Sequence, residues 1–296
     1  LKRYIITDKS FYWEAILIIV PVVLQAIVNQ GVNMMDTIMV GKLGEAAISA
    51  SSLANQFYNI YTFLCMGLSA AGLVLTAQYW GAGDKVTVSR VFDLLIQIIA
   101  AASILFGLVS FFFAREIMSI YTPDAEVIEM GARYLKITAF VYFPHGIALV
   151  ISNIMRSVGN PRIGLYVSIA SFFINIGTNY VFIFGKLGFP AMGVAGAAVG
   201  TLCSRIVEFV VCVLFVLFVD KQLQYRVTGL LKLPGISLFK EFVRLGLPAI
   251  ISDTILAFAS SAISIILGHM GKEFVSAYSI VMVVDRMCTL ATQGVG

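Results

Sequence analysis

The chain has 296 residues, of which 59% are hydrophobic and only 12% charged, and its mean hydropathy is +0.94. A soluble globular protein carries about 25% charged residues, so this composition excludes a water-soluble enzyme, a disordered protein and a nucleic-acid-binding protein. The net charge of +4, from 20 Lys and Arg against 16 Asp and Glu, is not gathered into one basic face. We therefore predict an all-α polytopic membrane protein whose surroundings are a lipid bilayer.

Eight apolar segments are long enough to cross a bilayer, which takes about 20 apolar residues per helix. Clusters of Gly, Pro and charged residues separate these segments. The segments lack an alternation of apolar and polar residues, which argues against a transmembrane barrel, and the first is too long for the apolar region of a signal peptide. In chain order the predicted helices span residues 11–40, 46–78, 91–114, 127–153, 163–184, 193–219, 245–268 and 274–296.

Basic residues predict the orientation, because loops rich in Lys and Arg stay in the cytoplasm. With the N-terminus inside, 12 Lys and Arg fall on the cytoplasmic side and 6 on the outer side. We therefore predict a cytoplasmic N-terminus.

The sequence contains an internal repeat with an offset of 227 residues. Over residues 11–52, eight positions are identical in the second copy without a gap. The matches include a proline inside the first helix, a GxxG turn 20 residues later and a Ser-Ala pair that opens the next helix. The offset covers six predicted helices, an even number, so both copies enter the membrane in the same direction, as in transporters with parallel repeats.

The repeat predicts how the chain is divided. We expect a first lobe over 1–219, a cytoplasmic linker over 220–244 and the start of a second lobe over 245–296. A second lobe as long as the first would need four more helices, so the working protein should have about twelve. The alternative is an eight-helix protein in which the match is a coincidence.

The first predicted helix carries a polar stripe. Gln25, Asn29, Asn33 and Asp36 follow the spacing i, i+4, i+8, i+11, which places them within about 80° on one face of a helix. Lipid does not accommodate such a face. The amides could serve equally as contacts between helices, whereas a carboxylate inside a membrane is costly and favours a function.

A second polar cluster lies on the fifth and sixth predicted helices. Asn175 and Asn179 are one turn apart, and Thr201 lies in the next helix. Together with Asp36, these residues would offer one charge and several neutral oxygens. That set suits a hard monovalent cation, or a proton held on the carboxylate.

Other ionisable residues give weaker signals. Arg205 and Glu208 are three residues apart on one helix, so we interpret them first as a structural ion pair. His145 and His269 have no ligand partners in the sequence, and the four cysteines form no CxxC motif. No nucleophile with a base, no HExxH and no ATP-binding GxxxxGK run is present. We therefore predict no enzyme activity, no organic cofactor and no ATP-driven pump.

Four runs of sequence, in this order, resemble motifs of the multidrug and toxic compound extrusion (MATE) family. They are NMMDTIMVGKLG at 33–44 (followed by AAISA), RSVGNP at 156–161, NIGTNYVFIFG at 175–185 and GFPAMGVAG at 188–196. The resemblance implies two six-helix lobes around a central cavity. It also implies export of organic cations and drugs in exchange for Na⁺ or H⁺, by a monomer in the bacterial inner membrane.

The same resemblance implies site residues. Asp36, Asn175, Asn179 and Thr201 match the family's site for the coupling cation, although some members carry Asp where this chain has Asn179. Many relatives carry Glu near the position of Asp253. We expect the substrate cavity to include Gln25, Asn29, Asn33 and Asp253.

The nearest rival function is a flippase for lipid-linked oligosaccharides, as in relatives with similar lobes. Such a protein needs several basic residues to hold a diphosphate. Only Arg205 and Arg286 lie at membrane depth here, beside acidic residues of opposite sign. The sequence therefore favours the antiporter.

Overall fold

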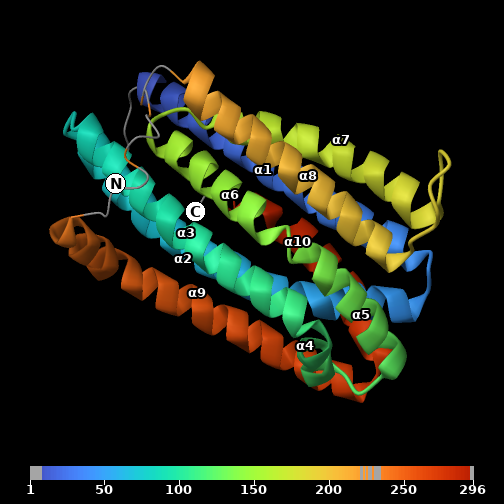
Figure 1. Cartoon of the computed structure of the whole chain (residues 1–296). Coiled ribbons are helices and arrows are strands. Elements are labelled where there is room, and N and C mark those ends of the chain that lie inside the picture. The colour runs from blue at the N-terminus through green and yellow to red at the C-terminus, as the bar shows by residue number, and fades with distance from the viewer. Residues whose placement is uncertain (1–8, 221–222, 224, 226–228, 230–234, 294–296) are drawn as a thin grey trace, which may run out of the picture.

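The computed structural model describes residues 9–220, 223, 225, 229 and 235–293, without the side chains of 9–15, 18 and 286–293. Every regular element in these residues is a helix. The long helices run side by side in an elongated bundle (Figure 1). The predicted all-α fold class is confirmed for the described part of the chain.

The first three helices are α1 (Lys9–Gly41), α2 (Glu45–Gly81) and α3 (Lys85–Phe112). They match the predicted spans, except that α3 starts before residue 91. The cause is a cap at Asp84, whose carboxylate accepts hydrogen bonds from the Thr87 backbone amide at 3.0 Å and from the Thr87 hydroxyl at 2.6 Å. Such a cap satisfies a backbone donor that the first turn of a helix leaves free.

The prediction of one continuous helix over 127–153 is wrong. The structure has α5 (Ala125–Thr138) and α6 (Tyr142–Ser157), with a bend of 55° between them. Pro144 lies in the first turn of α6, where its missing N–H cannot bond the carbonyl four residues earlier, so the helix is interrupted there. A short helix that the sequence did not indicate, α4 (Ala114–Tyr121), precedes α5.

The next two helices form a tight pair. They are α7 (Arg162–Phe184) and α8 (Val194–Leu214), and α8 continues into a π-helical turn at Phe215–Val219. A Cβ added at Gly196 would lie 2.5 Å from the carbonyl carbon of Phe182. Only a glycine therefore lets α8 approach α7 this closely, as small residues do in other membrane helix pairs.

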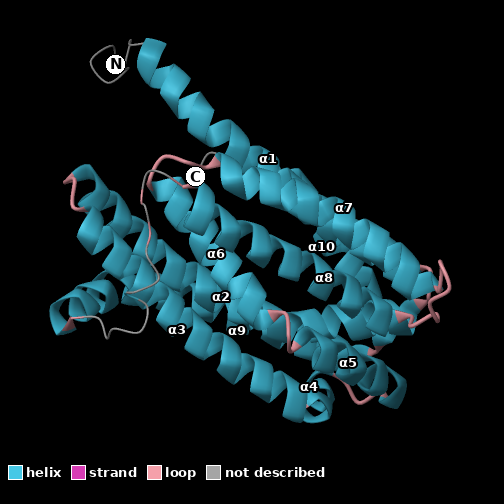
Figure 2. Cartoon of the chain, turned by 45° about the horizontal axis from the view of Figure 1, so that its top comes forward, coloured by secondary structure: helices cyan, strands magenta, loops and turns pink. Residues whose placement is uncertain are grey.

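The last two helices are α9 (Ile236–Met270) and α10 (Lys272–Gln293). α9 begins before the predicted residue 245, so its first turns fall within 220–244, the range predicted as a linker. Much of the rest of that range lies outside the described residues. α9 packs along α2, and α7 packs along α1, as two views of the bundle show (Figures 1 and 2).

The repeat found in the sequence is also present in the backbone. α1 and α9, and likewise α2 and α10, begin 227 residues apart. The matched Gly44 and Gly271 both have positive φ, 106° and 130°, a region that favours glycine. The hydroxyls of Ser52 and Ser279, matched at the same offset, are hydrogen-bonded at 2.6 Å. Contact between equivalent positions is what a two-fold axis produces, so an approximate axis passes between these serines.

The outer surface is apolar. In the described residues, five helices are long and apolar enough to cross a membrane, and the bent α5–α6 pair would make a sixth. Large side chains such as Leu105, Phe173 and Phe218 are exposed on these helices. Lipid accommodates such a surface, whereas soluble monomers expose only small apolar patches. The chain is a multi-pass membrane protein.

A double replacement of Ser52 and Ser279 by cysteine should give an intramolecular disulfide. Hydroxyls 2.6 Å apart show that the two side chains meet, as the two cysteines of a disulfide must. The measurement is a gel shift after mild oxidation, in a protein that lacks its native cysteines and has a protease site inserted between 220 and 235. The single Ser52→Cys variant is the control, and absence of the cross-link in the double variant would contradict the axis.

Candidate functional site

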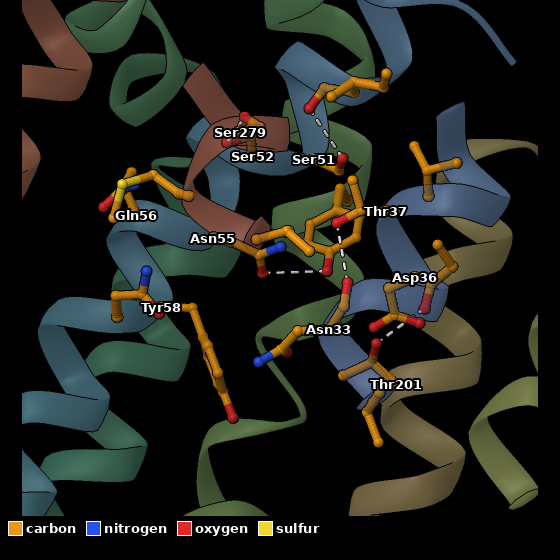
Figure 3. A pocket seen from close by; sticks show the side chains of 18 of the residues that line it. Asn33, Asp36, Thr37, Ser51, Ser52, Asn55, Gln56, Tyr58, Thr201 and Ser279 are labelled. Atoms are coloured by element: carbon orange, nitrogen blue, oxygen red, sulfur yellow. Dashed lines mark hydrogen bonds between the residues drawn. The ribbon is translucent and has the colours of Figure 1, made fainter. Parts of the chain in front are cut away.

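A cavity of about 200 Å³ lies within the bundle. Residues from α1, α2, α5, α7, α8, α9 and α10 line it, and most of them are amides and hydroxyls (Figure 3). Among the described lining residues, only Asp36 and Arg205 are charged. The cavity is therefore polar and carries one carboxylate and one guanidinium.

Asp36 and the two predicted asparagines form one hydrogen-bonded group. Asn179 Nδ2 donates to Asp36 Oδ1 at 2.5 Å and to Asn175 Oδ1 at 3.1 Å. Both asparagines are buried, 1% exposed for Asn175 and 0% for Asn179. Thr201 lies beside Asp36 (Figure 3), and its hydroxyl donates to the Ala197 carbonyl at 3.0 Å. A hydroxyl that donates in this way still has an oxygen that can accept a hydrogen bond or bind a cation.

A second glycine of α8 places Asn179. A Cβ added at Gly200 would lie 1.9 Å from Asn179 Oδ1. Gly196 and Gly200 are four residues apart, so both lie on the face of α8 that contacts α7. This close contact fixes the asparagine with its amide toward Asp36.

The hydrogen bonding of the two asparagine amides is incomplete. Asn175 Nδ2 and Asn179 Oδ1 are buried and have no hydrogen-bond partner. A buried polar group without a partner costs about 1–3 kcal/mol. Asn179 Oδ1 packs against Gly200, whereas Asn175 lines the cavity, so a ligand or a water in the cavity can complete the bonding of the Asn175 amide.

The other predicted cavity residues are placed differently. Asn33 lines the cavity. Gln25 packs against α7, where a Cβ at Gly164 would lie 2.6 Å from its Oε1, and Asn29 is exposed. Asp253 does not line the described cavity, because α9 meets the cavity at Ser260, about 10 Å further along the helix.

A polar face on α2 was not among the predicted site residues. Ser52, Asn55, Gln56 and Asn59 line the cavity at positions that recur with the helical period. Asn55 Oδ1 accepts a hydrogen bond from the Tyr134 hydroxyl at 3.2 Å. The helical period of 3.6 residues, which marks the polar stripe on the first helix, also marks this polar face of α2.

The ion pair predicted for α8 is confirmed. Arg205 Nη1 donates to both carboxylate oxygens of Glu208, at 2.9 and 2.8 Å. The Arg205 side chain is 22% exposed and that of Glu208 is 9% exposed. Arg205 also lines the cavity, so the pair lies at the edge of the site that holds Asp36.

Replacing Gly200 by alanine should destabilise the protein and displace Asn179 from Asp36. A Cβ at 1.9 Å from Asn179 Oδ1 overpacks the α7–α8 contact, at a cost of about 1–3 kcal/mol. The measurement is the midpoint of thermal unfolding of the purified protein. Gly177→Ala is the control, because open space surrounds Gly177 on α7. An equal loss in both variants would contradict the role of Gly200.

Comparisons with known proteins agree on one family. The model of the MatE family matches residues 21–181. A probable multidrug resistance protein NorM of Agrobacterium fabrum is 30% identical over 274 residues, which are 92% of this chain and 58% of that protein. The NorM of Thermotoga maritima is 28% identical over 284 residues, 95% of this chain and 60% of that protein. The chain thus spans little more than half the length of these relatives.

Solved structures show the same fold. A structure of the MATE multidrug transporter DinF-BH superposes with a TM-score of 0.85 at 20% identity, over 97% of this chain and 63% of that one. A MOP superfamily transporter from Pyrococcus furiosus gives a TM-score of 0.80 at 21% identity, over 95% of this chain and 61% of that one.

Proposed function

The chain belongs to the MATE family, and from that premise we propose that it forms the ion-coupling part of a secondary antiporter. The antiporter would export organic cations, drugs among them, in exchange for Na⁺ or H⁺. The observation that carries this proposal is Asp36, a carboxylate on a membrane helix that faces a polar cavity and is held by Asn179.

Asp36 needs a positive partner. Within the described residues it forms no ion pair, and a charged group taken out of water without a partner is strongly destabilised. The hydrogen bond from Asn179 stabilises the anion only in part. A cation or a proton that enters from the cavity would complete the neutralisation, so the site should bind one of the two.

Na⁺ and H⁺ make different use of the same residues. For Na⁺, the ligands would be Asp36, the Thr201 hydroxyl and the amide oxygen of Asn175, because hard cations prefer oxygen. Asn179 would continue to hold Asp36 through its Nδ2. For H⁺, the proton would sit on Asp36. With Asn at 179, the site has a single carboxylate, which suits a monovalent ion.

Exchange follows from competition for one charge. An organic cation in the cavity and the coupling ion both gain from Asp36, and they cannot both neutralise it. Each ligand shifts the protein toward the conformation that binds it better. Rocking of one repeat against the other would then present the site to either side of the membrane.

The rival function is less compatible with the cavity. A flippase for lipid-linked oligosaccharides needs several cations for its diphosphate. Among the described lining residues Arg205 is the only cation, and Glu208 already holds it. We therefore propose small organic cations as substrates, with the protein acting as a monomer in the bacterial inner membrane and its N-terminus in the cytoplasm.

Replacing Asp36 by asparagine should abolish ion-driven transport without unfolding the protein. The amide keeps the size and hydrogen bonding of the side chain but removes the charge for which ion and substrate compete. The measurement uses a fluorescent organic cation in inverted membrane vesicles, with an Na⁺ gradient and a pH gradient imposed in separate experiments.

The matched control is Glu129→Gln, which also removes one carboxylate but breaks only an exposed pair with Arg133 on α5. It should transport like the unmodified protein. Ion-driven transport by Asp36→Asn at the unmodified rate would refute the assignment.

A further inference from the structure

The Arg205–Glu208 pair lies next to the proposed ion site. Arg205 is four residues after Thr201 on α8, so both side chains are on one face, about 6 Å apart along the helix. Asp36 and Arg205 line the same cavity and carry opposite charges, which attract each other. The guanidinium of Arg205 is thus a permanent positive charge in the same cavity as Asp36, the carboxylate to which the coupling ion would bind.

Nothing in the chemistry of Arg205 prevents it from pairing with Asp36. A guanidinium has five donors and binds carboxylates well. Only Nη1 is used in the pair with Glu208, and Nε is buried without a partner. An arginine released from Glu208 would therefore find Asp36 as an acceptor.

Glu208 is what holds Arg205 in place. Its carboxylate is almost completely buried, and both of its oxygens accept from Nη1. Separating a buried carboxylate from a buried guanidinium is costly, because each charge is then left buried without a partner. The pair is therefore a restraint on Arg205 as well as a contact.

We propose that Glu208 keeps Arg205 from neutralising Asp36 and thereby sets the affinity of the coupling-ion site. This inference rests on the function proposed above. With all three groups charged, Asp36, Arg205 and Glu208 sum to one negative charge, which a single Na⁺ or H⁺ neutralises. Without the charge of Glu208 the sum is zero, and the coupling ion has no charge left to compensate.

The remaining titratable groups around the pair do not supply another cation. Tyr58 of α2 is buried with an unpartnered hydroxyl and lies within electrostatic reach of both Arg205 and Glu208. The ring of His145, on α6, is 5.4 Å from that of Tyr58, and neither of its nitrogens has a partner. Tyr134 of α5 donates to an amide. Arg205 is therefore the group whose position decides the charge at Asp36.

The test compares Glu208→Gln with the double variant Arg205→Gln/Glu208→Gln in the intact protein. The readout is the concentration of Na⁺ that half-displaces a fluorescent organic cation kept well below its own dissociation constant, so that the value reports the affinity for the ion; in a second series H⁺ replaces Na⁺. Glu208→Gln should raise that concentration about tenfold, a typical coupling between two sites. The double variant should return it to within about threefold of the unmodified value, because it removes both the freed cation and its restraint.

Controls separate a structural effect from an effect on charge. Glu129→Gln breaks the exposed pair with Arg133 and should change nothing. Arg205→Gln alone should lower the half-displacing concentration, because it leaves two negative charges. If Glu208→Gln does not fold, the inference stands on Arg205→Gln and on the double variant, each with its predicted direction.

Two results would overturn the inference: an unchanged ion requirement in Glu208→Gln, or a double variant as weak as Glu208→Gln. Failure of the proposed function is distinguishable, because Asp36→Asn would then still show displacement by the ion. If Asp36→Asn loses that response while Glu208→Gln keeps the unmodified affinity, only the role of Glu208 is wrong.

Discussion

The hydrogen bond from Asn179 to Asp36 is the interaction on which the site depends. It joins α1 to α7 where the two helices pack along each other, and it places a carboxylate at the edge of a polar cavity. The glycines at 196 and 200 allow this geometry, because they let α8 press against α7 and hold the asparagine. The close contact between α7 and α8 thus fixes the direction of the Asn179 amide, which the charge of Asp36 alone would not do.

Much of the fold follows from the sequence, because apolar length, Gly and Pro punctuation and the 227-residue repeat report backbone geometry directly. The break between α5 and α6 was not predicted. Apolar residues continue across it, so hydropathy has no signal there, and Pro144 is compatible with either a kink or a new helix. The start of α9 was predicted too late for the opposite reason, because its first turns contain charged residues such as Lys240, Glu241 and Arg244, which lower the hydropathy there.

Only part of the site could be predicted from the sequence, and the reason is physical. Asp36, Asn175 and Asn179 are polar residues in apolar surroundings, so composition alone marks them. Which polar faces meet depends on how helices rotate against one another, and the sequence does not contain that. The face of α2 carries no charged residue and was not predicted, whereas Asp253 was predicted because relatives of the family carry Glu near its position. A charged residue in an apolar segment shows that its burial is costly, but the position of the residue in the bundle decides whether it lines the cavity.

The serine contact at 52 and 279 limits how the two halves of the protein can differ. A residue on a two-fold axis faces its own counterpart, so it must be compatible with itself. A hydroxyl meets that demand because it can donate and accept at once, whereas two like charges would repel and two large side chains would collide. Each of these two positions therefore has to suit its counterpart as well as its own helix, which favours a small side chain that can both donate and accept a hydrogen bond.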